Sequence, residues 1–151
     1  MLLLMEADKE ILDGFVEEIR ALEKVLKSIV QKMISSKLKD MKLFEQYGQT
    51  IDRVYGTAAT LGFNELAEYT KSLKDLSYKC SQSDNEKGIR KTAEMLIHCL
   101  KYLDQICKGI HDAEELKKVR YLMSVDISKA EKLCRSYFFS INRVSCEIKK
   151  N

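Results

Sequence analysis

The chain has 151 residues, no proline, six glycines and 32% charged residues. A single domain of this length buries enough apolar surface to fold without disulfides or metals, and the lack of proline with abundant Leu, Lys and Glu favours helices. Basic residues exceed acidic ones by only three (26 against 23) and both signs are interspersed, which argues against a nucleic-acid-binding protein.

The cysteine pattern excludes a disulfide framework and a zinc site, because the number is odd and no Cys-x-x-Cys spacing occurs. The five are Cys80, Cys99, Cys107, Cys134 and Cys146, which we expect to be small apolar residues in a reducing compartment.

The opening Met-Leu-Leu-Leu-Met is too short for a signal-peptide core, and no apolar run approaches the ~20 residues of a membrane span. We therefore predict a cytoplasmic protein with no metal, cofactor or membrane contact.

The first predicted helix runs from about Asp8 to Ser35, where Ser35 and Ser36 predict a break. Apolar residues recur every three or four positions on its expected core face: Ile11, Phe15, Ile19, Leu22, Leu26, Ile29 and Met33. The second predicted helix follows Asp40 and ends at Gly62, with one apolar stripe of Leu43, Phe44, Tyr47, Ile51, Val54, Ala58 and Leu61. Gly48 lies within this stripe and is expected to be a close packing point.

The third predicted helix begins after Asn64, which we expect to act as its N-cap while Phe63 packs back on the first turn. The polar run 81–85 predicts a loop. A fourth helix is predicted from about Glu86 to Gly109. Four helices of this length joined by short turns indicate an antiparallel up-and-down bundle over residues 8–110, within a single domain of 1–151.

Residues 111–151 form a predicted C-terminal helical extension. Ser124 or Asp126 is a candidate cap for a separate last helix, so we favour two helices over one long helix hinged at Gly109. The apolar face of this extension must pack on the bundle, pair with a second copy or receive a partner.

The segment from Asp52 to Gly62 carries the most specific pattern of the chain, Asp-Arg-Val-Tyr-Gly-Thr-Ala-Ala-Thr-Leu-Gly. It resembles the signature of the histidine phosphotransfer (HPt) domain of two-component signalling, His-x-Leu-Lys-Gly-Ser-Ala-x-x-Leu-Gly. Gly56 and Gly62 keep the spacing of the signature, and the broader resemblance covers roughly residues 8–108. It implies an all-α protein, an antiparallel four-helix HPt-like bundle with the C-terminal extension added.

The chain departs from this signature where the chemistry takes place. Asp52 stands in place of the phosphate-accepting histidine, and Tyr55 in place of the lysine that would favour a phosphoryl group. A neutral imidazole nitrogen is a good nucleophile near pH 7, and an exposed helix carboxylate is not its equivalent. The resemblance therefore implies a degenerate, pseudo-phosphotransfer domain that is not an enzyme.

The resemblance also implies a docking face for a protein partner, a response-regulator receiver domain or a histidine kinase. The candidate partner-binding residues are Asp52, Arg53, Tyr55, Gly56, Ala59 and Phe63. A glycine inside a helix costs about 1 kcal/mol relative to alanine, and close approach of a partner at Gly56 would compensate. Asp52 would repel the acidic pocket of a receiver unless a metal or a basic side chain lay between. The candidates for this positive charge, or alternatively for a solvated rim, are Arg53, Lys71, Lys74 and Lys79.

Other interpretations remain open at this level. Asp52 is alternatively an ordinary surface carboxylate, and Tyr55 a tyrosine half buried between helices. The protein is alternatively a helical oligomerisation or scaffold protein, for instance a homodimer formed through residues 111–151. A third alternative is an active phosphotransfer protein that uses His98 or His111, the two histidines of the chain.

Overall fold

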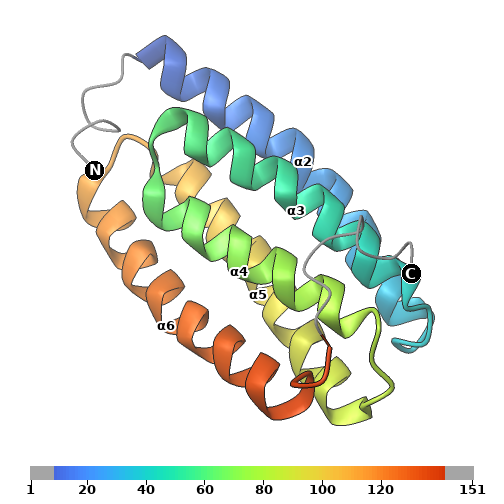
Figure 1. Ribbon diagram of the computed structural model, residues 1–151. Helices are drawn as coiled ribbons and strands as arrows, with labels where there is room; N and C mark the ends of the chain where they lie inside the picture. The colour runs from blue at the N-terminus through green and yellow to red at the C-terminus, as the bar shows by residue number, and fades with distance from the viewer. Residues whose placement is uncertain (1–8, 142–151) are drawn as a thin grey trace.

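The computed structural model describes residues 9–141, which form five helices without any strand in that range (Figure 1). The chain is therefore all-α, as the composition and periodicity predict. The helices are α2 (Lys9–Ser35), α3 (Lys42–Leu61), α4 (Asn64–Cys80), α5 (Glu86–Lys108) and α6 (Ala113–Tyr137).

Successive helices run in opposite directions because the loops that join them are short (Figure 1). α3 packs against both α2 and α4, and α5 also contacts α2 and α4. α6 lies across α4 and α5, on the side of the molecule opposite α2. The outward side of α3 is thus flanked by α2 and α4, and this position determines what α3 presents to solvent.

The core draws large apolar side chains from all five helices. The fully enclosed ones include Ile19, Leu26, Phe44, Ile51, Leu66, Leu73, Leu96, Leu103 and Met123. The apolar stripes predicted for the first two helices are confirmed, with one notable exception at the start of α2. Ile11, which we expected to face the core, is 54% exposed because it lies in the first turn, beside an open groove described below.

The connection between α3 and α4 confirms one predicted helix signal and corrects another. Gly62 ends α3 with φ of 85°, a left-handed conformation that glycine adopts without strain, and Phe63 N donates to Ala58 O at 2.9 Å. Asn64 is not the N-cap: it is the first residue of α4, and Phe63 occupies the cap position without a side-chain hydrogen bond. Burial of the Phe63 ring, which is fully enclosed, decides the geometry of this turn in place of side-chain capping.

α6 is one continuous helix, so the expected division into two helices is wrong for the described residues. Its N-cap is Asp112, whose Oδ1 accepts from Glu114 N at 3.1 Å and Glu115 N at 3.3 Å. Ser124 donates its hydroxyl to Tyr121 O at 2.7 Å, inside the helix, and Asp126 is buried rather than capping. Residues 142–151 of the predicted extension lie outside the described residues.

The described cysteines pack as small apolar residues. Cys80, Cys99 and Cys107 are buried and Cys134 is half-buried. Burial raises the pKa of Cys80 and of Cys99 to about 12, so about one thiol in ten thousand is ionised at pH 8.

We expect iodoacetamide to modify Cys134 in the native protein well before Cys80 or Cys99, as measured by peptide mass spectrometry. Labelling in urea provides the control, and equal native labelling of all three would contradict this packing.

Candidate functional site

The exposed side of α3 carries five of the six residues expected to bind a partner. Asp52, Arg53, Gly56 and Ala59 are exposed and Tyr55 is half-buried, at spacings that place them along the outward side of one helix. The Asp52 side chain retains 48% exposure. We call these five residues, together with Lys74 of α4, the α3 face.

Lys74 changes the electrostatics of this face. Its Nζ lies 3.2 Å from Asp52 Oδ1 and 5.7 Å from the centroid of the Tyr55 ring. The ion pair is partly exposed, so it contributes little to the free energy of unfolding, and the cation–π contact adds a comparable amount. Its larger effect is local: the negative charge of Asp52 is offset by an ammonium group, and the Tyr55 ring is held beneath it.

An open groove runs beside the α3 face, between α2 and α3. It has a volume of about 720 Å³ and is lined by Ile11, Gly14, Phe15, Glu18, Arg53, Gly56, Thr57, Thr60 and Leu61. A Cβ added at Gly14 or at Gly56 would meet nothing within 4 Å in the described chain beyond its own turn of helix. Thr57 donates its hydroxyl to Glu18 Oε1 at 2.9 Å and links the two walls. Backbone from two helices is thus accessible on one surface, which we call the α2/α3 groove.

Gly14 is a residue that the sequence reasoning missed. Its signal was a glycine inside a strongly amphipathic helix, at a position where helix propensity alone disfavours it by about 1 kcal/mol. The periodicity gave no indication that Gly14 and Gly56 line the same groove, because their contact surface depends on how α2 packs on α3.

Phe63 lies apart from the α3 face. Its side chain is fully buried, and its ring centroid is 6.5 Å from that of Phe15. A partner docked on the exposed side of α3 would not touch it, so Phe63 is a core residue and not part of the contact surface.

The two histidines belong to other parts of the molecule. His98 is exposed on α5, where it lines a pocket between α5 and α6. His111 lies in the loop before α6, with Nε2 3.4 Å from Asp13 Oδ1 on α2, and both of these side chains are more than half exposed. Neither histidine lies on α3 beside Gly56, so the fold does not place a histidine next to Gly56 as the HPt signature does.

Within residues 9–141, no group of three or more His, Cys, Asp or Glu side chains is arranged to hold a metal ion, and no helix has the length and hydropathy of a membrane span. The α3 face therefore offers three groups to a ligand or partner: the Asp52 carboxylate, whose charge is offset by Lys74, the Tyr55 ring, and the accessible backbone at Gly56. Comparison of the chain with protein-family models, with curated proteins and with solved structures gave no match.

Proposed function

We propose that this protein is a non-catalytic, HPt-like adaptor or regulator that binds a receiver domain or a histidine kinase through the α3 face, without phosphoryl transfer. In this proposal α2 to α5 correspond to the antiparallel four-helix HPt-like bundle, and α6 to an added helix. The observation that carries the proposal is Gly56, which lies exposed beside Asp52 with open space where a side chain would be. A helix-interior glycine with no neighbour to accommodate is most simply explained by a partner that approaches the backbone.

Loss of phosphoryl transfer in this proposal follows from the group at position 52. Asp52 offers a carboxylate, one oxygen of which is paired with Lys74 at 3.2 Å. A carboxylate needs a metal and further acids to accept a phosphoryl group, and the α3 face has no second acid at Asp52. Binding without chemistry is therefore the activity that these residues support.

Lys74 supports the choice of partner. The phosphoacceptor pocket of a receiver is acidic, so a bare carboxylate at position 52 would repel it. The ammonium of Lys74 lies beside that carboxylate and over Tyr55, where it offsets the repulsion and offers its own attraction.

The test is to measure the affinity of the purified chain for the receiver domains and kinase phosphotransfer bundles of its own cell. We expect Lys74→Glu to weaken binding to a receiver at least about tenfold, because it places two acids on the α3 face opposite an acidic pocket. The change in the free energy of unfolding should stay below about 2 kcal/mol, since the variant loses one partly exposed ion pair and one cation–π contact. Lys74→Gln should fall between Lys74→Glu and the wild type.

A matched control is Lys117→Glu, the same charge change at an exposed position of α6. It should leave affinity within about twofold of the wild type at physiological ionic strength, where charges more than ~8 Å apart are largely screened. Equal effects of the two variants would indicate a general charge effect and contradict docking on the α3 face, as would failure of every receiver and kinase to bind.

A second candidate function is a homodimer formed through α6. The apolar face predicted for this helix is covered by α4 and α5, but Tyr121 is 68% exposed and Leu122 and Val125 are also exposed on its outer side. If these residues form an interface, the wild type should have the mass of a dimer by light scattering, and Tyr121→Glu with Val125→Glu should give a monomer. A monomeric wild type would remove this candidate.

A further inference from the structure

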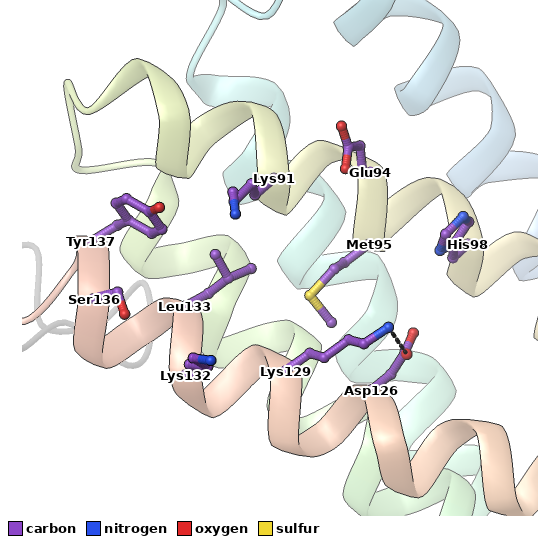
Figure 2. Close-up of a pocket in the computed structure, with 10 residues that line it drawn as sticks. All are labelled: Lys91, Glu94, Met95, His98, Asp126, Lys129, Lys132, Leu133, Ser136 and Tyr137. Atoms are coloured by element: carbon purple, nitrogen blue, oxygen red, sulfur yellow. Dashed lines mark ion pairs between the residues drawn. The ribbon is translucent and has the colours of Figure 1, made fainter.

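A second concave site lies between α5 and α6, on elements that contribute nothing to the α3 face. It has a volume of about 330 Å³, and its lining combines charged side chains with a buried apolar floor (Figure 2). The charged groups are Lys91, Glu94, Asp126, Lys129 and Lys132, and the apolar floor is formed by Met95 and Leu133. Three lysines and two carboxylates in so small a space indicate a site for a ligand that carries charge.

Asp126 is the unusual residue of this pocket. It projects from the middle of α6 and is only 4% exposed. Its Oδ1 lies 3.9 Å from Lys129 Nζ, at the outer limit of an ion pair, and its Oδ2 is enclosed with no hydrogen-bond partner among the described residues. A buried carboxylate is costly unless it is closely paired, so the charge of Asp126 is incompletely compensated among residues 9–141.

Tyr102 of α5 is a polar neighbour of Asp126. Burial, the charge of Asp126 and a side-chain hydrogen bond with Asp126, in that order, raise the pKa of the Tyr102 phenol to about 12, so a neutral hydroxyl and not a cation lies beside the carboxylate from α5. Lys129 is mostly exposed, and Figure 2 shows its side chain extended along the pocket towards the carboxylate. The Lys129 ammonium is therefore a loosely held group at the place where a better-positioned cation would be stabilised.

The other end of the pocket has the opposite charge. Lys91 Nζ lies 5.9 Å from the centroid of the Tyr137 ring, and Lys132 projects from α6 nearby. Figure 2 places Lys91, Lys132 and Tyr137 towards one end and Asp126 towards the other, with Met95 and Leu133 between them. Ammonium groups attract carboxylates and phosphates, and the apolar floor suits a short hydrocarbon segment.

We propose that the α5/α6 pocket binds a small zwitterion. Its ammonium group takes the place of the Lys129 ammonium at Asp126, and its carboxylate lies between Lys91 and Lys132. The intervening methylene groups cover Met95 and Leu133. A volume of about 330 Å³ is at the small end of ligand sites, which run from roughly 300 to 1,000 Å³, so the ligand is of amino-acid size. This site does not depend on the proposed adaptor function.

The test titrates the ¹⁵N-labelled full chain with β-alanine, γ-aminobutyrate and ε-aminocaproate, and with butyrate and butylamine as probes that carry one charge each. We expect at least one of the amino acids to bind at least about tenfold more tightly than either single-charge probe, because two charged groups act together. Amide shifts should be confined to α5 and α6. Absence of binding by all five probes, or equal binding of butyrate, would overturn the proposal.

Two variants test the Asp126 end and the Lys91 end of the pocket separately. Asp126→Asn keeps the shape of the side chain and should weaken the best amino-acid probe at least about tenfold, with butyrate binding unchanged. Retained butyrate binding also shows that this variant is folded. Lys91→Gln should weaken butyrate and the amino acid alike, whereas the control Lys117→Gln on the exposed side of α6 should change neither. Unchanged amino-acid affinity in Asp126→Asn would contradict the assigned orientation and the site.

Discussion

Gly48→Ala is expected to destabilise the protein by about 1–3 kcal/mol, whereas Gly56→Ala, on the same helix, is expected to stabilise it by about 1 kcal/mol. A Cβ at Gly48 would lie 2.6 Å from Cε1 of the buried Tyr78 ring. The ring cannot move away without disturbing the contact of α3 with α4, so overpacking outweighs the gain in helix propensity. At Gly56 the added Cβ meets open space, and only the propensity gain remains.

Thermal unfolding followed by circular dichroism measures both changes. For a chain of this size, 1 kcal/mol corresponds to about 2–4 °C in Tm, so the two variants should move in opposite directions from the wild type by readily measured amounts. Gly14→Ala gives an independent control, because its Cβ also meets open space and should stabilise α2. Destabilisation by Gly56→Ala would contradict the exposed position assigned to this glycine.

Gly56→Phe is expected to weaken binding of a receiver or kinase about 100-fold, which corresponds to about 2.7 kcal/mol. A phenylalanine side chain at this position projects from the outward side of α3 and prevents a partner from reaching the backbone. The Cβ at this position meets open space beside the open α2/α3 groove, so helicity and Tm should be preserved. Gly56→Ala should weaken binding less, although it stabilises the fold. Calorimetric titration gives the affinities.

Ser128→Phe is the matched control, since it introduces the same side chain at an exposed position of α6. It should bind a partner with wild-type affinity. If Gly56→Phe and Ser128→Phe bind equally well, the open space at Gly56 has no role in docking and the proposed contact surface is wrong. If Gly56→Phe unfolds the chain, the assignment of Gly56 to the surface is wrong as well.

The sequence predicts the helices well because their signals are local. Repeats of three and four residues identify the buried faces of α2 to α5, and Gly62 marks the end of α3 because glycine adopts the left-handed conformation of that turn without strain. The end of α2 at Ser35, predicted from Ser35 and Ser36, is confirmed, although no glycine marks it. Lys37 and Leu38 adopt positive φ values of 56° and 62°, and Leu38 N donates to Met33 O at 2.9 Å, so the same kind of turn forms without glycine.

The continuity of α6 could not be predicted because Ser124 and Asp126 are residue types that can either cap a helix or lie within one. Ser124 and Asp126 are good cap residues, but neither glycine nor proline interrupts 113–137, and packing of α6 on α4 and α5 keeps the helix intact through both. The composition of a segment cannot reveal whether a polar residue ends a helix or lies buried in it. That choice depends on the neighbouring helices.

The α3 face was predictable only in part, because its composition also depends on how the neighbouring helices pack. The spacing of Asp52, Tyr55 and Gly56 places them together on one helix, whereas the pairing of Asp52 with Lys74 joins residues 22 positions apart in the chain. The burial of Phe63 and the opposition of Gly14 and Gly56 also depend on tertiary packing. Local periodicity specifies the side of a helix, and only the packed fold specifies its neighbours.

The most direct test of the adaptor proposal is to locate the partner on the protein. Titration of the ¹⁵N-labelled chain with an unlabelled receiver domain or kinase bundle should shift and broaden amides of residues 49–60 and 71–75, with α6 unaffected. No phosphoryl group should appear on the chain when the partner is phosphorylated. Shifts centred on α6, or acid-labile phosphate on His98 or His111, would contradict the account.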